Sequence, residues 1–240
     1  MMTTRHTALA PMLVLSTTLL SAQSATTSAP SAYRTQFENE YVHLIRVHYG
    51  PNVKLPVHEH PTVVTVYVYL NASGPVEFRH VEDNRLATRR PTVAGSFRVS
   101  GGADEHHAVV NTTPTPSDFL RIEFKTDPAG ASSPFAREVM RSYPAGENAT
   151  DVKFANKQMR ITRLVVAPGK TLDQTTSASE PALIVATKDA TLAGLRQGNA
   201  TAVAAGQERW LDAGQTMRLV NSGSAPAELL RIDFLTGPKK

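Results

Sequence analysis

Short runs of apolar and β-branched residues follow one another from Tyr41 onward, with Gly, Pro, Asn and Asp between them. Many short runs separated by turn residues are typical of an all-β sandwich or barrel. No long segment keeps a helical period, and the best helix candidate is residues 134–141, PFAREVMR. The runs in the first half of the chain are YVHLIRVHY (41–49), VVTVYVYL (63–70), VEFRHV (76–81), SFRV (96–99), HAVVN (107–111) and FLRIEF (119–124).

The second half of the chain repeats the pattern of the first. Two matching stretches occur in the same order in both halves, and a matched Asn and a matched Arg recur at the same separation. The pairs are LIRVHYGPNVKLP (44–56) with ITRLVVAPGKTLD (161–173), VVNTT (109–113) with LVNSG (219–223), and FLRIEFKT (119–126) with LLRIDFLT (229–236).

The repeat predicts two tandem β-domains, residues 40–127 and residues 150–238. Roughly 90 residues is enough for the core of a small barrel. Residues 128–149, rich in Ala, Gly, Ser and Pro, are the expected linker between them.

The N-terminus has the pattern of an export signal. Arg5 is followed by an apolar stretch at residues 8–20 and then by small residues up to Ala25. We therefore expect a signal peptide over residues 1–24, with cleavage between Ala22 and Ala25, and a periplasmic or secreted protein that has no membrane segment after cleavage. Residues 25–39 begin with small polar residues and are predicted to be a flexible leader.

The composition excludes several kinds of site. The 240 residues contain no cysteine, which removes disulfides, thiolate zinc sites and iron–sulfur clusters. The formal net charge is +4, and the basic residues are scattered rather than arranged in a stripe, so a nucleic-acid partner is not expected. Metal ligands, if any, must be His, Asp or Glu.

Two histidines stand two residues apart at the head of an apolar run, in LPVHEHPTVVTVYVYL (55–70). Alternate residues of a strand share a face, so His58 and His60 can point into one cavity while Glu59 points away. Of the adjacent His106 and His107, only one can face inward.

These residues resemble the two motifs of the cupin family. Gly50, His58-Glu59-His60 and Gly74 are similar to the first motif, and the second is matched by Pro91, Gly95, His107 and Asn111. The resemblance implies a bicupin, with two tandem small antiparallel β-barrels of the double-stranded β-helix type. It selects His107 as the inward histidine and implies a metal site of His58, His60 and His107.

The sequence departs from the family at the acidic ligand, which would fall at Val64 or Thr65. If the strand keeps its pleat from His60, the residues Val64, Val66, Val68 and Leu70 form an apolar floor below the histidines. A three-His site is then expected, similar to cupins of the thiol-dioxygenase type. The alternative is a site that has lost tight metal binding.

The second half lacks the histidines, because all eight lie at or before residue 107. Alignment on Pro168 puts Thr175 and Ser177 where His58 and His60 stand, and alignment on Asn221 puts Met217 at the place of His107. The second barrel is therefore expected to be structural, either packing against the first or forming a homodimer surface.

The favoured hypothesis is an exported bicupin that binds one divalent transition metal, Fe, Mn, Ni or Zn, in its N-terminal barrel. Oxygenase or isomerase chemistry on a small-molecule ligand would fit the resemblance. The alternative is a non-catalytic binding or scaffold protein with a vestigial metal site. No nucleophile elbow, Walker motif or dinucleotide fingerprint is present.

Several other residues carry weaker expectations. Glu59 and Glu105 flank the histidines and are expected to be solvated carboxylates, the alternative being that one of them orients a ligand or acts as a base. Trp210 is expected to pack. Tyr67 and Tyr69 either pack on the outer face or line a pocket. The remaining strand histidines, His43, His48, His80 and His106, are expected to be structural, with His106 the best candidate to support the site.

Overall fold

The computed structural model describes residues 23–102, 105–127, 135–198 and 200–239. These ranges are folded mainly as β-strands, with one short helix, α1 (Ala25–Ser28). Among them, no helix is both long and apolar enough to cross a membrane. Most of the predicted signal peptide lies outside the described residues.

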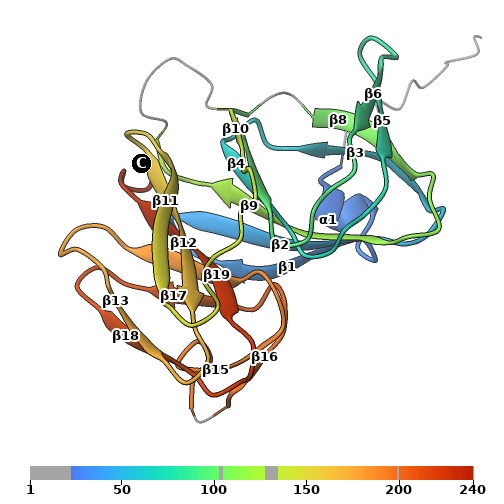
Figure 1. The fold of residues 1–240 in the computed structure, drawn as a ribbon. Coiled ribbons are helices and arrows are strands. Elements are labelled where there is room, and N and C mark those ends of the chain that lie inside the picture. The colour runs from blue at the N-terminus through green and yellow to red at the C-terminus, as the bar shows by residue number, and fades with distance from the viewer. Residues whose placement is uncertain (1–22, 103–104, 128–134, 199, 240) are drawn as a thin grey trace, which may run out of the picture.

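The N-terminal barrel consists of two antiparallel sheets (Figure 1). The larger has six strands in the order β1-β2-β9-β4-β7-β10, and the smaller has four in the order β3-β8-β5-β6. The strands are β1 (Tyr33–Glu38), β2 (Val42–Tyr49), β3 (Lys54–His60), β4 (Thr65–Tyr69), β5 (Val76–His80), β6 (Leu86–Arg89), β7 (Phe97–Ser100), β8 (Glu105–Asn111), β9 (Ser117–Phe124) and β10 (Ala136–Arg137).

The C-terminal barrel repeats this arrangement strand for strand. Its sheets have the orders β11-β12-β19-β14-β17 and β13-β18-β15-β16, which match the first barrel without β10. The strands are β11 (Ala149–Ala155), β12 (Met159–Val166), β13 (Thr171–Thr175), β14 (Ala182–Ala186), β15 (Ala190–Ala193), β16 (Ala202–Val203), β17 (Glu208–Leu211), β18 (Thr216–Asn221) and β19 (Ala227–Phe234). The expected all-β fold of two tandem barrels is confirmed.

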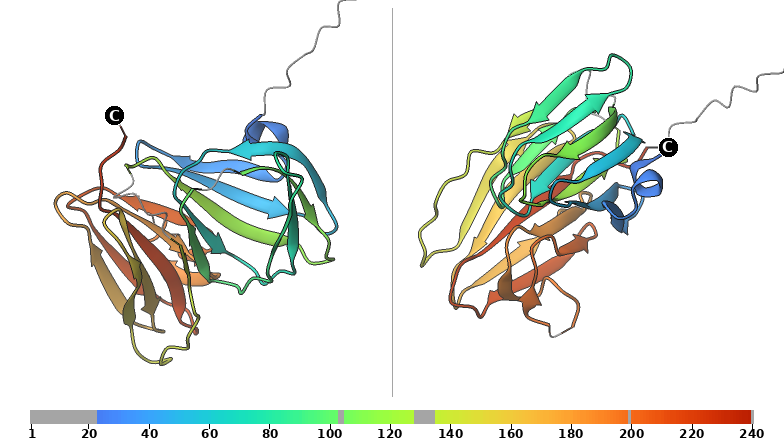
Figure 2. Two further views of the ribbon diagram at one scale, coloured as in Figure 1. Left: turned by 90° about the horizontal axis from the view of Figure 1, so that it is seen from above. Right: turned by 90° about the vertical axis from the view of Figure 1, so that its right-hand side faces the viewer.

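The two larger sheets pack against each other, so the barrels lie side by side (Figure 2). One continuous apolar core joins them, with Val66, Leu120 and Ile122 from the first barrel and Ile161 and Ile232 from the second. Strands in the middle of this stack are buried on both faces, which explains why β4 and β14 are nearly continuous apolar runs. The second barrel therefore packs against the first, which confirms one of the two roles expected for it.

Trp210 belongs to the same contact. Its ring centroid lies 5.9 Å from that of Phe37 and 5.6 Å from that of Tyr41, both in the first barrel. The expectation that this tryptophan packs is confirmed, and it packs across the interface.

The flexible leader predicted for residues 25–39 is wrong. This segment contains α1 and β1, and β1 pairs with β2 as the edge strand of the larger sheet. The composition was misleading because an edge strand is held by backbone hydrogen bonds and needs few apolar side chains. Tyr33 is its main buried anchor, only 2% exposed.

The helix predicted for residues 134–141 is also wrong over the part that the structure describes. Ala136 and Arg137 form β10, which pairs with β7. The free edge of β7 offers backbone partners to this segment, and that pairing overrides a weak local preference for helix.

Candidate metal centre

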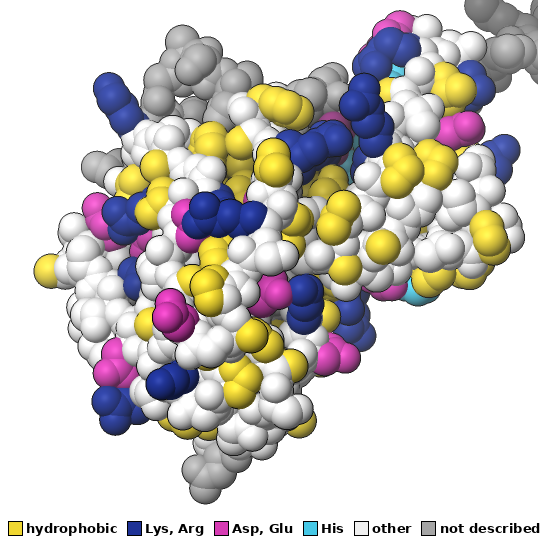
Figure 3. Space-filling view, in the orientation of Figure 1, with side chains coloured by type: hydrophobic (Ala, Val, Ile, Leu, Met, Phe, Trp, Pro, Cys, Tyr) yellow, Lys and Arg dark blue, Asp and Glu magenta, His cyan; other side chains and the backbone are white. Residues whose placement is uncertain are grey.

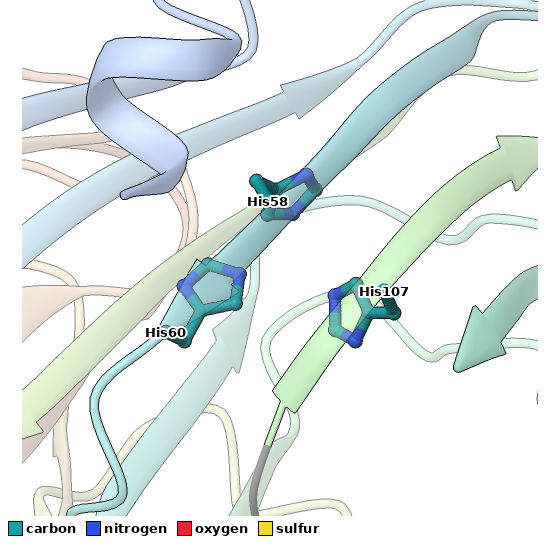
Figure 4. A group of neighbouring side chains, drawn as sticks. All are labelled: His58, His60 and His107. Atoms are coloured by element: carbon teal, nitrogen blue, oxygen red, sulfur yellow. The ribbon is translucent and has the colours of Figure 1, made fainter. Parts of the chain in front are cut away.

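Two neighbouring strands of the smaller sheet carry the three predicted histidines. His58 and His60 lie on β3, and His107 lies on β8 (Figure 4). His58 stands directly opposite His107 in the antiparallel register. The strand alternation that the sequence predicted therefore places the three imidazoles on one face, inside the barrel.

The three rings meet in a buried cluster. His58, His60 and His107 are 0%, 6% and 4% exposed, and one ring nitrogen from each lies within 4.8 Å of the others. Ligand atoms of one first-row ion lie roughly 3–4 Å apart, so modest ring rotations would close the set around an ion. The structure thus brings together all three residues that the sequence singled out.

His58 is held in a defined tautomer. Its Nδ1 lies 2.9 Å from the carbonyl oxygen of Pro56, which can only accept, so Nδ1 carries the proton. Nε2 is left as the acceptor and receives a hydrogen bond of 2.9 Å from the hydroxyl of Tyr33. That hydroxyl also lies 2.6 Å from the hydroxyl of Tyr49.

The other two histidines have open nitrogens. Both ring nitrogens of His107 are buried and have no hydrogen-bond partner within the part of the chain that the structure describes. Nδ1 of His60 lies 3.9 Å from Oε1 of Glu123, beyond a direct hydrogen bond. A buried imidazole without partners is energetically costly, and a metal ligand is one way to satisfy it.

All three histidines are neutral at pH 7. Burial lowers the pKa of each below the ordinary value for histidine, and the nearby Arg121 cation adds to the effect. For His107 the pKa falls to about 3. Neutral imidazoles offer lone pairs, so the donor set fits a divalent first-row metal.

Buried acids lie beside the cluster, although the strand after His60 carries none. Arg121 on β9 donates to Glu123 at 2.6 Å and to Glu105 at 2.5 Å, and it also donates to the hydroxyl of Tyr67 at 2.7 Å. Glu123 stands directly opposite Thr65, one of the two positions expected for the family's acidic ligand. A carboxylate therefore lies near that position, but it belongs to the neighbouring strand β9.

The expectation that Glu105 is solvated is wrong. Its side chain is 18% exposed, and its carboxylate bonds both Arg121 and Tyr67. Burial opposes its charge, but these partners hold its pKa below the ordinary value for glutamate. Glu59, by contrast, is exposed as expected.

The apolar floor predicted below the histidines is wrong. Strand β3 ends at His60, and β4 begins at Thr65 in the other sheet, so the pleat is not continuous between them. Val64, Val66, Val68 and Leu70 face the second barrel as part of the shared core. Tyr67 and Tyr69 face the cavity instead.

A cavity of about 410 Å³ opens beside His60 and His107. Tyr67 and Tyr69 line it, so the pocket-lining alternative holds for both. Its wall also includes His80, whose ring centroid lies 5.8 Å from that of His107.

The remaining histidines of the described chain do not belong to the cluster. His106 points away and pairs with Glu82 at 2.8 Å, so it does not support the cluster as the sequence suggested. His48 is exposed and bonds Asp118, while His43 reaches Glu123 at 3.2 Å from the far side.

The second barrel has no metal-binding set at the matching place. Gln174 stands opposite Met217 in β13 and β18, as His58 stands opposite His107, and the next inward residue is the buried Thr176. Met217 stands at the place of His107, as predicted. The residues at the places of His58 and His60 are Gln174 and Thr176, each one position before the predicted Thr175 and Ser177. The cause is a β-bulge in β3 between Leu55 and His58 that β13 lacks.

Sequence reasoning missed Tyr33, Arg121 and Glu123. Tyr33 lay in the segment taken for a leader. The other two had a visible signal, because Phe119, Arg121 and Glu123 alternate in a buried strand, and charged residues on an inward face are rarely there without partners.

Comparison with known proteins bears on the fold. No protein-family model matches the sequence, and no curated protein matches it. A cupin 2 conserved barrel domain protein from Leptotrichia buccalis matches 85% of this chain over 88% of its own length, with 14% identity and a TM-score of 0.51.

Two further solved structures agree. The bacterial pirin YhhW from Escherichia coli, in complex with nickel(II), covers 86% of this chain and 91% of its own, at 12% identity and a TM-score of 0.57. An oxalate decarboxylase from B. subtilis matches 85% of this chain over 72% of its own length, at 10% identity and a TM-score of 0.54. With two matching barrels in tandem, this chain has the cupin fold in its double-barrel form.

Proposed function

We propose that the N-terminal barrel binds one divalent transition metal through His58, His60 and His107 and presents it to a small molecule in the adjoining cavity. The observation that carries the proposal is His107, a buried neutral imidazole with neither ring nitrogen hydrogen-bonded to any described residue, within ligand distance of two other imidazoles. Fe, Mn, Ni and Zn all suit such a donor set.

The protein's own residues set the state of His58. Pro56 fixes its tautomer and leaves Nε2 as the acceptor nitrogen. Tyr33, whose pKa burial raises well above its ordinary value, keeps its proton and donates to that nitrogen, with Tyr49 as its other partner, so the Tyr33 hydroxyl has to move aside before Nε2 can bind a metal. His60 and His107 border the cavity and are only 6% and 4% exposed. When bound, the metal would supply Lewis-acid chemistry to a coordinated oxygen.

We propose oxygenase or isomerase chemistry on a small molecule as the activity, and export to the periplasm or exterior as the setting. The signal pattern supports export. Cleavage after Ala22 would keep the hydrogen bond of 3.1 Å that Glu59 N donates to the carbonyl oxygen of Gln23. The intact mass of protein recovered from the exported fraction should correspond to a chain beginning at Gln23. A mass that retains residue 1 would contradict export by this signal.

Elemental analysis tests the metal proposal. Protein purified without chelator should carry about one metal ion per chain, and the His58→Ala/His60→Ala variant should lose it. His106→Ala is the matched control, because His106 neighbours His107 but points away, and this variant should keep the metal. Less than about a tenth of an equivalent in the parent protein would overturn the proposal.

A non-catalytic binding or scaffold protein with a vestigial site is the second candidate. The hydrogen bond between the hydroxyl of Tyr33 and Nε2 of His58 favours this candidate, because it occupies a nitrogen that a metal would need. A metal bound to the native state would stabilise it. Thermal unfolding with and without chelator separates the candidates, because an unchanged midpoint supports the scaffold and a lowered midpoint supports the metal site.

A further inference from the structure

The cavity beside the histidines is strongly basic. Among the residues that the structure describes, six arginines line it and one carboxylate, that of Glu105. Figure 3 shows Lys and Arg side chains at the rim of a hollow in the N-terminal barrel, with histidine atoms visible inside it. A wall with one sign of charge, backed by low-dielectric protein, concentrates ligands of the opposite sign.

Three of these arginines form a row across the inner face of the larger sheet. Arg121 stands opposite Tyr67, Tyr67 opposite Arg98, and Arg98 opposite Arg137. Only Arg121 is neutralised, by Glu105 and Glu123. Neither Arg98 nor Arg137 forms an ion pair with any residue placed in the structure. The row therefore carries charge that no described residue balances.

Arg98 is the best-placed donor without an acceptor. Its guanidinium lies over the ring of Tyr67, 4.3 Å from the centroid, and its Nε is buried with no hydrogen-bond partner among the described residues. Stacking on the ring fixes the plane of the guanidinium while leaving its edge available. A planar, oriented guanidinium is the usual partner of a carboxylate or a phosphate.

Arg89 approaches the same space from the smaller sheet. It donates to Ser117 at 2.7 Å and to Ser73 at 3.1 Å, but its Nε is also buried without a partner in the described chain. Burial lowers its pKa, and the charge of Arg98 adds to the effect. Two nearby cations held this way are stabilised by an anion between them.

The rest of the wall is aromatic. Tyr49, Tyr69, Phe78 and Phe119 line the cavity together with the arginines. The volume of about 410 Å³ is at the small end of ligand pockets, enough for one ring and its substituents. The wall therefore offers an aromatic surface for the apolar part of a ligand, next to the charged groups.

We propose that the cavity takes a small organic anion, with its acidic group held by Arg98 and Arg89 and its apolar ring against the aromatic wall, beside the three histidines. This inference rests on the proposed function in one respect only, that the anion is the small molecule presented to the metal. Binding of the anion itself requires only the cavity.

Calorimetric titration with matched probes tests the inference. Benzoate, benzamide and phenyl phosphate share a ring, and only benzamide is neutral. Each is titrated into chelator-treated protein and into protein loaded with nickel. At least one anion should bind about tenfold tighter than benzamide, as charge-assisted hydrogen bonds are stronger than neutral ones. Comparison of benzoate with phenyl phosphate identifies the preferred acidic group.

Variants assign the effect to the arginines. Arg98→Gln should weaken the anion about tenfold and leave benzamide unchanged, and Arg98→Lys should recover part of the loss. Arg137→Gln, at an exposed position, gives a second test that does not disturb the packing on Tyr67. Arg79→Gln is the control, since Arg79 is exposed on β5 outside the cavity and its loss should change nothing.

Equal affinity for the anions and benzamide, or unchanged anion affinity in Arg98→Gln, would overturn the inference. Metal content is measured separately on the same samples. A protein that binds nickel but prefers no anion contradicts this inference alone. A protein that binds benzoate through Arg98 but holds no metal contradicts the proposed function alone.

Discussion

Replacement of Arg121 by methionine is expected to destabilise the protein by about 3–5 kcal/mol, the usual loss when one partner of a buried ion pair is removed. Arg121 is 3% exposed and compensates two acids, Glu105 and Glu123, while also binding Tyr67. Burial alone would lower its pKa, but these partners hold the pKa well above the ordinary value for arginine. Without it, two carboxylates would stand uncompensated beside the histidines. Urea denaturation measures the loss.

Arg231→Met is the matched control, because Arg231 occupies the same place in the repeated motif of the second barrel. Arg231 pairs with Asp233 at 2.7 Å, but Asp233 also pairs with Arg160 at 3.1 Å. Its carboxylate therefore keeps a cation when Arg231 is lost, and the free energy of unfolding should fall less than in Arg121→Met. An equal or larger loss in Arg231→Met would show that Arg121 holds no special charge balance.

Replacement of Arg121 by methionine should also change the pKa values of the three histidines. Burial is the first cause of the low pKa values of His58, His60 and His107, and the Arg121 cation contributes to each. Its removal should raise these pKa values, so the histidines of Arg121→Met should titrate at higher pH in NMR spectra of the metal-free protein. Unchanged titration in a folded variant would contradict this electrostatic role.

The fold was largely accessible from the sequence because the chain encodes it twice. Asn111 and Asn221 recur at the same spacing, and each uses its side-chain amide to close the turn after its strand. Asn111 binds the carbonyl oxygens of Gly50 and Thr115, and Asn221 binds those of Val166 and Ala225. A repeated buried polar residue with the same contacts marks the same turn, and so the same strand order, in both barrels.

The segments that were misjudged are edge strands. β1 and β10 join the larger sheet through backbone pairing, and their side chains are mostly exposed or half-buried. Their sequences need no apolar alternation because backbone groups make the pairing and few of their side chains are buried. Information about such strands lies in the sheet that receives them, which local sequence does not reveal.

The three histidines were accessible because they lie on regular strands, where alternation fixes the face. The apolar floor was not accessible from the sequence. The alternation of side chains between the two faces of a strand does not continue across residues 61–64, where the chain passes from one sheet to the other. The one-residue error in the second barrel has a similar origin, since a bulge changes parity without leaving a sequence signal that could be recognised from one chain. Periodicity is thus reliable within a strand and uninformative across its ends.

The linker carries a buried charge, Glu138, which pairs with Arg163. Replacement of Arg163 is expected to cause a large loss of stability. Arg163 on β12 is 1% exposed and binds three parts of the chain. It donates to Glu138, next to β10, at 2.6 Å, to the carbonyl oxygen of Gly95 in the first barrel at 2.6 Å, and to Glu228 in the second at 3.3 Å. Arg163→Met is expected to lower the free energy of unfolding by about 3–5 kcal/mol. Arg218→Met, at an exposed pair, should give no resolvable change.

A double-mutant cycle shows whether that loss comes from the ion pair. The side chain of Glu138 is only 1% exposed, so Arg163→Met alone leaves a buried carboxylate, whereas Arg163→Met/Glu138→Met replaces both charges with apolar groups. The double variant should therefore recover part of the stability lost by the single one. Strictly additive losses would mean that the two residues act independently. In that case the position of residues 135–148 would depend on β10 pairing with β7 rather than on this buried pair.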